Sequence, residues 1–438
     1  MNLAQTPITF DLDAAPARLD WHTHAIRDRR GRLMPNLANV LTLMRTNPLV
    51  ETCLAYDLML GAALLTAPLP GTIGDTASLP RPVEDIDATQ LLEWLQRNGL
   101  ARAAKDTVHQ AIDLRARERA FHPVRDSLAA LAFDGQPRLA NWLSTYLGAA
   151  PSAYASAIGE MFLVSMVARV FEPGCKADHM LILEGPQGSG KSTACTILGG
   201  RWFSDTLPDV TLGKEAAQHL AGKWLIEIAE MSALGRAEEA ALKAFISRPT
   251  ERYRPSYGRR EIVQKRQCVF IGTTNRSAYL RDASGGRRYW PIATGRIDIA
   301  ALARDRDQLL AEALVAYREG RRWWPDAGIE RTLIKPQQEA RFESDAWEDT
   351  IAAWLAGKTR ATIGEIARAA LTIETSRLGT ADQRRIVAVL ERQGWRRLPK
   401  DRFGNRPWGP AEGDGARRTT AQSLQLPLEN GEAKPGNR

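Results

Sequence analysis

The chain has 438 residues, a formal net charge of +8 and 44 % hydrophobic residues. At about 150 residues per domain, this length predicts about three domains, and the apolar content excludes a wholly disordered chain. The surplus of Lys and Arg favours a polyanionic partner such as nucleic acid or an anionic membrane.

The cysteines and the apolar stretches indicate in which cellular compartment the protein is expected. The four cysteines are widely spaced with no C-x-x-C pair, so they predict neither a disulfide framework nor a zinc knuckle. The first residues lack the basic cluster and apolar run of a signal peptide. The stretch 58–69 is interrupted by Gly61 and Pro68 and is shorter than the roughly 20 residues of a membrane span. We therefore expect a cytoplasmic protein with no membrane partner.

In chain order, residues 1–150 predict a mostly helical N-terminal domain, because apolar residues recur at helical spacing. Residues 151–322 alternate short apolar runs with helical segments, which predicts an α/β core with a parallel sheet flanked by helices. The apolar runs lie at 181–183, 224–228 and 268–271. A polar linker is expected over 323–345.

Residues 346–408 predict three helices and a two-stranded wing, a pattern typical of a winged-helix DNA-binding domain. Two T-x-x-E/Q patterns, starting at Thr362 and Thr380, fit the capping box that begins a helix. A turn at 404–405 is expected to join the two strands of the wing. The Gly-, Pro- and charge-rich segment 409–438 predicts a disordered tail.

The strongest motif lies at 185–192 and reads Gly-Pro-Gln-Gly-Ser-Gly-Lys-Ser. It satisfies G-x-x-x-x-G-K-[ST] and lies between an apolar strand and a helix, as a P-loop NTPase requires. Glycines allow backbone N–H groups to converge on phosphate oxygens. We expect Lys191 to reach the β- and γ-phosphates of ATP and the Ser192 hydroxyl to bind Mg²⁺. The expected nucleotide-binding residues are Gly185, Pro186, Gln187, Gly188, Ser189, Gly190, Lys191, Ser192 and Thr193.

Polar side chains at the ends of the next two apolar runs are candidates for catalysis. A phosphate loop needs an acidic partner at the end of a neighbouring strand, to hold Mg²⁺ and polarise water. We expect Glu227 to hold the metal and Glu230 to orient the attacking water. Exchanged roles, or a merely superficial position for one of them, remain open. Asn275 is expected to sense the γ-phosphate or to position water.

Arg281, Arg287 and Arg288 flank a glycine turn and are candidates for an arginine finger. Such a guanidinium stabilises charge on the transferring phosphoryl group. A finger that acts on a neighbouring subunit requires an oligomer. Salt bridges inside the subunit are the alternative.

Residues 248–266 form a basic stripe with seven basic and two acidic residues. Basic groups bind phosphates while aromatic rings stack on bases, so this combination suits a single nucleic-acid strand. The candidates in this stripe are Arg252, Arg254, Tyr257, Arg259 and Arg260. A solvated basic face is the alternative.

Arg384 and Arg385 lie on the expected recognition helix of the winged-helix domain. Such a helix enters a DNA major groove, so both arginines are candidates for DNA contacts. A winged helix used for protein contact is the alternative.

Eight short segments, taken together and in order, resemble the virulence-associated E family. They lie at 122–126, 133–138, 173–176, 184–188, 224–230, 252–255, 273–275 and 286–290. This family comprises phage and mobile-element P-loop ATPases related to superfamily three helicases of the AAA+ class. The resemblance implies a hexameric, ATP-driven DNA translocase that acts in replication, with the basic stripe in a central channel. Many relatives carry a primase domain, and because none is recognisable here, priming would need a separate protein.

The sequence thus favours an ATP-dependent DNA helicase of a phage or mobile element. Two alternatives remain open. One is a nucleotide-switched DNA-binding or origin-recognition ATPase that does not unwind DNA. The other is a P-loop kinase of a small molecule.

Overall fold

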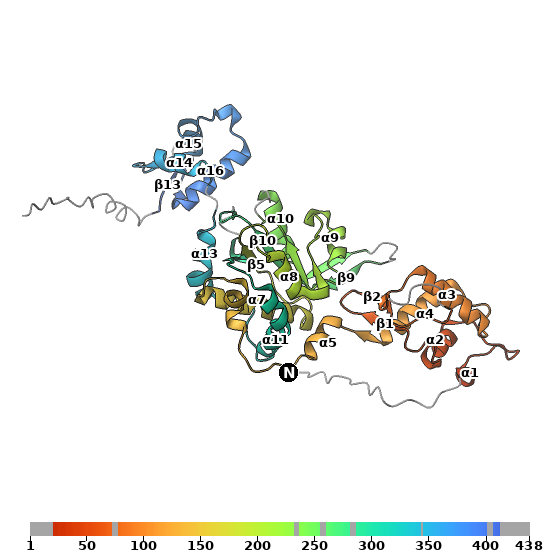
Figure 1. The fold of residues 1–438 in the computed structure, drawn as a ribbon. Helices are drawn as coiled ribbons and strands as arrows, with labels where there is room; N and C mark the ends of the chain where they lie inside the picture. Colours follow the sequence, from red (N-terminus) through yellow and green to blue (C-terminus); the bar gives the residue numbers. More distant parts are fainter. Residues whose placement is uncertain are drawn as a thin grey trace, which may run out of the picture. The chain divides into compact units, whose positions relative to one another are not determined.

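The computed structural model describes residues 21–71, 78–231, 236–254, 260–280, 286–342, 345–400 and 406–411. The chain divides into two compact units, shown in Figure 1. The first unit extends to Arg341, and the second comprises the residues from Phe342 onward together with Leu280.

The N-terminal part of the first unit combines helices with a small sheet. The helices are α1 (Trp21–His24), α2 (Leu37–Thr46), α3 (Asp85–Arg97) and α4 (Lys105–Glu118). The strands β1 (Leu54–Asp57), β2 (Ala62–Leu65), β3 (Arg81–Pro82) and β4 (Ala120–Phe121) form a sheet of order β3-β2-β1-β4. Helical periodicity predicts the helices of this part but not this sheet. Its strands have two to four residues, too few for a period of two to stand out.

The larger sheet of the first unit has five parallel strands in the order β11-β5-β10-β7-β6. They are β5 (Met180–Glu184), β6 (Phe203–Ser204), β7 (Leu225–Ile228), β10 (Val269–Thr274) and β11 (Tyr289–Ala293). The three predicted apolar runs correspond to β5, β7 and β10, so the expected parallel α/β core is confirmed. Strands buried on both faces read as continuous apolar runs, which is why these were recognisable.

Helices cover this sheet (Figure 1). They are α5 (Pro123–Ala129), α6 (Trp142–Leu147), α7 (Ala153–Phe171), α8 (Lys191–Gly199), α9 (Lys214–His219), α10 (Arg236–Ile246) and α11 (Ile299–Arg318). One buried cluster contains Val124, Trp142, Phe162 and Leu183. Helices α5 and α6 therefore pack with the sheet, although the sequence analysis assigned residues up to 150 to the N-terminal domain.

Helix α7 is a longer apolar stretch than residues 58–69, which the sequence analysis weighed as a membrane span. Among the described residues it is the one helix long and apolar enough to cross a membrane by length and composition. Within its apolar window, however, 78 % is buried inside the protein. Its side chains lie in the sheet's hydrophobic cluster and pack against α11, so core packing accounts for its composition.

The expected polar linker is structured over most of its length. It contains α12 (Ala327–Ile329), a π-helical turn (Glu330–Ile334) and α13 (Lys335–Glu339). Ile334 is fully buried in the sheet's cluster, and Gln338 donates a hydrogen bond to the Tyr289 carbonyl at 2.7 Å. The prediction of a linker over 323–345 was wrong, because a few apolar side chains on one face suffice to hold this segment against the core.

The basic stripe contains an antiparallel pair of strands, β8 (Thr250–Tyr253) and β9 (Ile262–Lys265). Thr250 pairs with Lys265 and Tyr253 with Ile262, the register that a hairpin requires. Residues 255–259, which join the two strands, lie outside the described residues.

The second unit contains α14 (Glu348–Leu355), α15 (Ile363–Ala369), α16 (Thr380–Arg392), β12 (Trp395–Arg397) and β13 (Trp408–Pro410). Strands β12 and β13 pair antiparallel, as expected for the wing, whose turn lies outside the described residues. The capping box at Thr362 is confirmed by hydrogen bonds in both directions with Glu365. At the start of α16 the expectation was wrong, since Gly379 is the N-cap and its N–H donates to Asp382.

Candidate nucleotide site

The loop 185–190 joins the end of β5 to the start of α8, at the carboxyl edge of the parallel sheet. Ligands of open α/β sheets bind at this edge. Gly188 and Gly190 have φ of +77° and +91°, in the left-handed region that favours glycine. A Cβ on Gly185 would lie 2.6 Å from Thr294 Oγ1. Gly188 and Gly190 are therefore required by the backbone of the loop, and a side chain at Gly185 would displace the Thr294 hydroxyl.

Lys191, the first residue of α8, folds back over this loop. Its Nζ donates to the carbonyls of Gly185 and Pro186, each at 2.7 Å, and to Ser189 Oγ at 3.3 Å. Burial lowers the pKa of Lys191, and the neighbouring Glu227 carboxylate opposes that shift. The ammonium is thus held on the inner side of the loop, where the sequence analysis places phosphate oxygens.

Glu227 on β7 is the buried acid of the site, with 1 % of its surface exposed. Its Oε1 accepts hydrogen bonds from Ser192 Oγ and from Thr273 Oγ1, both at 2.7 Å. Its Oε2 is buried and has no hydrogen-bond partner in the structure. The structure therefore brings together Ser192 and Glu227, the two expected metal ligands.

Thr273 was not among the expected site residues. The sequence analysis noted the small polar end of its strand but selected Asn275. Thr273 pairs with Leu183 of β5 in the sheet, and its hydroxyl reaches across to the neighbouring β7. A polar residue inside an otherwise apolar central strand was the signal that could have identified it.

The residues around Glu227 fit a magnesium ion. Mg²⁺ prefers oxygen ligands and is usually held by one or two carboxylates together with substrate phosphates. The unpaired, buried Glu227 Oε2 next to the Ser192 hydroxyl offers such a donor set. Within the described ranges no group of three or more His, Cys, Asp or Glu side chains gathers to hold a metal. The remaining ligands of a bound Mg²⁺ would have to come from a nucleotide and water.

Glu230 and Asn275 lie at the same edge of the sheet, and both are exposed. Thr274 pairs with Glu184, so Asn275 follows at the level of the loop, and Gly272 pairs with Ile228, two residues before Glu230. Glu230 has φ of +52°, which is unfavourable for a residue other than glycine. Such strain clusters at functional sites and is a reason to test this residue.

Two of the three candidate arginines lie away from the loop 185–190 of their own subunit. In the sheet Tyr289 pairs with Met180, so Arg287 and Arg288 lie at the amino edge, opposite the loop. The five residues of β5 separate the two edges by roughly 16 Å at about 3.3 Å per residue. Neither arginine forms an ion pair with a described carboxylate, and Arg288 Nε is buried without a partner. Arg281 lies outside the described residues.

A second missed feature lies directly before the loop. Glu184, the last residue of β5, accepts two hydrogen bonds from Arg341, from Nε at 2.7 Å and from Nη2 at 2.9 Å. It also accepts one from the Tyr279 hydroxyl at 2.9 Å. Burial and the adjacent Glu184 carboxylate raise the pKa of Tyr279. Glu184 and Arg341 are 157 residues apart, so no local pattern could have predicted this cluster.

The basic residues of the stripe divide into a structural and an exposed group. Arg266 is fully buried, pairs with Glu251 and lies over the Phe245 ring at 4.6 Å, so it holds the base of the hairpin. Arg252, Arg254 and Arg260 are exposed. Tyr257 and Arg259 lie outside the described residues.

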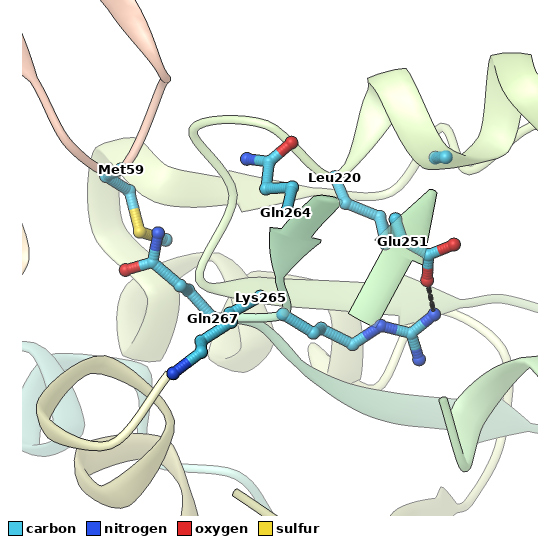
Figure 2. A pocket seen from close by; sticks show the side chains of 8 residues that line it. Met59, Leu220, Glu251, Gln264, Lys265 and Gln267 are labelled. Atoms are coloured by element: carbon cyan, nitrogen blue, oxygen red, sulfur yellow. Dashed lines mark hydrogen bonds and ion pairs between the residues drawn. The ribbon is translucent and has the colours of Figure 1, made fainter. Parts of the chain in front are cut away.

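The cavity at the hairpin base is too small for a ligand. Its volume of about 10 Å³ admits at most one water molecule. Figure 2 shows it between Met59, Leu220 and the residues of the hairpin base. Here Gln267 Nε2 donates to the Leu58 carbonyl at 3.0 Å, and the Gly222 N–H donates to the Met59 carbonyl at 2.9 Å. At this cavity the turn between β1 and β2 therefore packs against the residues around the hairpin base.

In the second unit the two candidate arginines differ. Arg385 Nε donates to Asp345 at 2.6 Å, and its guanidinium lies 3.8 Å from the centre of the Trp347 ring. Arg385 is thus engaged inside the unit. Arg384 is exposed.

Residues 128–343 match the family described as the virulence-associated protein E-like domain. No curated protein matches the chain. Similar solved structures include "The apo structure of NrS-1 C terminal region (305-718)", at 12 % identity and a TM-score of 0.42, covering 82 % of this chain and 95 % of that one. A second, "The A form apo structure of NrS-1 C terminal region-CTR(305-718)", has 13 % identity and a TM-score of 0.43, covering 86 % and 99 %.

Proposed function

Through residues 128–343 the chain belongs to the virulence-associated protein E-like family. On that premise, we propose that the protein is an ATP-dependent DNA translocase or helicase. It would act in the replication of a phage or mobile element. ATP and Mg²⁺ would bind at the carboxyl edge of the parallel sheet. The domain assignments as a P-loop ATPase core and a winged-helix domain are part of this proposal.

The observation that carries the proposal is the environment of Glu227. A buried carboxylate with one unpaired oxygen is costly unless a ligand completes it. The Glu227 carboxylate accepts a hydrogen bond from the hydroxyl of Ser192, the last residue of the motif at 185–192. When bound, Mg²⁺ would neutralise charge that develops on the phosphates. Lys191 would exchange its two carbonyl partners for phosphate oxygens.

DNA is the proposed polymer because exposed arginines project from a hairpin of the ATPase core. Arg252, Arg254 and Arg260 are exposed on or beside β8 and β9, while the hairpin base is anchored by buried Arg266. A hairpin with a rigid base and exposed cations is suited to binding a phosphate backbone. Arg252 also pairs with Glu261 at 2.9 Å, an exposed ion pair that costs little to break.

An oligomer is proposed because the amino-edge arginines face away from the loop of their own subunit. Arg287 and Arg288 can complete a phosphate site only if a second copy presents its loop to them. A ring of six subunits is the arrangement that the family resemblance implies.

The experiment is a comparison of ATP hydrolysis with and without single-stranded DNA, and of fork unwinding, in wild type and two variants. Lys191→Ala is expected to abolish both activities. Neutralising Arg254, Arg259 and Arg260 is expected to abolish unwinding and DNA stimulation but to retain basal hydrolysis. Tight DNA binding with hydrolysis but no unwinding would instead indicate a nucleotide-switched DNA-binding protein. Saturable phosphorylation of a metabolite would indicate a kinase.

A further inference from the structure

The second unit has a basic cavity on the side formed by α14 and α15. The cavity has a volume of about 240 Å³ and lies between the end of α14, the segment that follows it, and α15. Its lining residues are Trp354, Lys358, Arg360, Glu365, Arg368 and Ala369. No expected DNA-contact residue lines it, because those expectations concern α16.

The charges of the lining favour an anion. Three cations face one carboxylate, and that carboxylate is engaged elsewhere, since Glu365 Oε2 accepts from the Thr362 N–H at 2.7 Å and from its hydroxyl at 2.9 Å. The ion pairs found among the described residues of this unit join Arg385 to Asp345 and Arg392 to Glu348, so Lys358 and Arg368 take part in none of them.

One of these cations is held at the cavity by an aromatic ring. The Lys358 ammonium lies 4.5 Å from the centre of the Trp354 ring, within the range of a cation–π contact. Trp354 itself packs against the hydrophobic core of the unit. The ammonium therefore stays at the cavity wall instead of extending freely into solvent.

Basic residues continue from the cavity across the small sheet. Ala361, which follows Arg360, pairs with Trp408 of β13. On the other side of β13, Gly409 pairs with Arg396. In this antiparallel register Arg360 is level with Gly409, so the two arginines lie on either side of one strand, separated by about two strand spacings, or roughly 10 Å. This continuity indicates a polymer that runs past the cavity.

The volume and the charge of the cavity bear on whether its ligand is a free small molecule or part of a polymer. Sites for small ligands and cofactors are typically about 300–1,000 Å³ and mostly apolar. A smaller, basic cavity accommodates one charged group of a longer molecule. Non-specific contacts to a nucleic-acid strand are made by Lys and Arg at its phosphates.

We infer that this cavity is a phosphate-binding subsite for single-stranded DNA, with Lys358 and Arg368 as its main contacts. It is separate from the proposed ATP site, and its lining does not include Arg384. The inference rests on the proposed function only for the identity of the polymer.

The test is the salt dependence of binding of a fluorescent oligothymidylate to the full chain, measured by anisotropy without nucleotide. Each lost phosphate contact to a single strand reduces the slope of log K against log salt by about 0.7. The double variant Lys358→Gln/Arg368→Gln should therefore lower the slope by about 1.4 and weaken binding roughly ten-fold at 0.15 M salt. The variant Lys358→Arg/Arg368→Lys should bind as wild type.

A matched control removes the same charge elsewhere. Arg32→Gln/Arg97→Gln replaces two exposed arginines of the N-terminal part and should leave the slope unchanged. An unchanged slope in the cavity variant, or an equal loss in the control, would overturn the inference. So would loss of duplex binding alone, or competition by polyglutamate as strong as that by DNA of equal charge. Because no ATP is used, failure of the proposed ATPase activity leaves this result interpretable.

Discussion

Replacement of Arg341 by Met tests whether the cluster before the phosphate loop stabilises the core. The substitution removes both guanidinium hydrogen bonds from Glu184 and leaves only the Tyr279 hydroxyl on a carboxylate that is 6 % exposed. Removing one partner of a buried pair typically costs about 3–5 kcal/mol. Because the Arg341 side chain is 15 % exposed and Tyr279 remains, we expect about 3 kcal/mol here.

The assay is urea unfolding of the full chain, followed by circular dichroism and resolved into its transitions. A double-mutant cycle with Glu184→Gln provides the control, since removal of both charges should recover most of the loss. Tyr279→Phe alone should cost about 1 kcal/mol. A loss below about 0.5 kcal/mol for Arg341→Met, or single-mutant losses that simply add in the double variant, would refute the reasoning.

Three further predictions concern strain, pH and assembly. Glu230→Gly should relieve the positive φ and stabilise the core by about 1 kcal/mol in urea unfolding, while it lowers ATP turnover; a gain in both would argue against a catalytic role. Burial would raise the pKa of Asp87. Hydrogen bonds from the Arg81 guanidinium and from the Glu84 backbone N–H outweigh that effect, so the pKa is lowered. Its stabilising effect is therefore complete above the unfolded pKa of about 3.9 and is lost as pH falls through the folded value. Asp87→Asn should accordingly cost about 3 kcal/mol at pH 7 and progressively less as the pH falls below about 3.9 in thermal melts, and a pH-independent cost would contradict this. Mixing the Lys191→Ala chain with the Arg287→Ala/Arg288→Ala chain should restore part of the ATPase activity of either alone, and no restoration would count against a finger acting between subunits.

The parallel core was predictable because its physics is local. A strand buried on both faces is mostly apolar, so β5, β7 and β10 stood out as short apolar runs. The glycine-rich turn between β5 and α8 was predictable for a similar reason, since positive φ at Gly188 and Gly190 requires a glycine pattern. The meeting of Ser192 with Glu227 followed from the rule that the carboxyl ends of parallel strands share one edge.

The remaining features depend on contacts between distant residues. The ion pair between Glu184 and Arg341 joins a strand end to a segment that looked like a linker, because its sequence is mostly polar. The engagement of Arg385 by Asp345 depends on a contact 40 residues away, which helix periodicity does not contain. The N-terminal sheet was missed because strands of two to four residues have no measurable period.

The most direct test of the nucleotide site is a titration of the full chain with a fluorescent ATP analogue, with and without Mg²⁺. Wild type should bind tightly and more tightly with Mg²⁺, because Ser192 and Glu227 offer it an incomplete oxygen shell. Lys191→Ala should bind at least ten-fold more weakly, since it loses the ammonium that faces the loop. Glu227→Gln should bind the analogue but lose the Mg²⁺ dependence. Binding that is unaffected by both substitutions would contradict the assignment of this site.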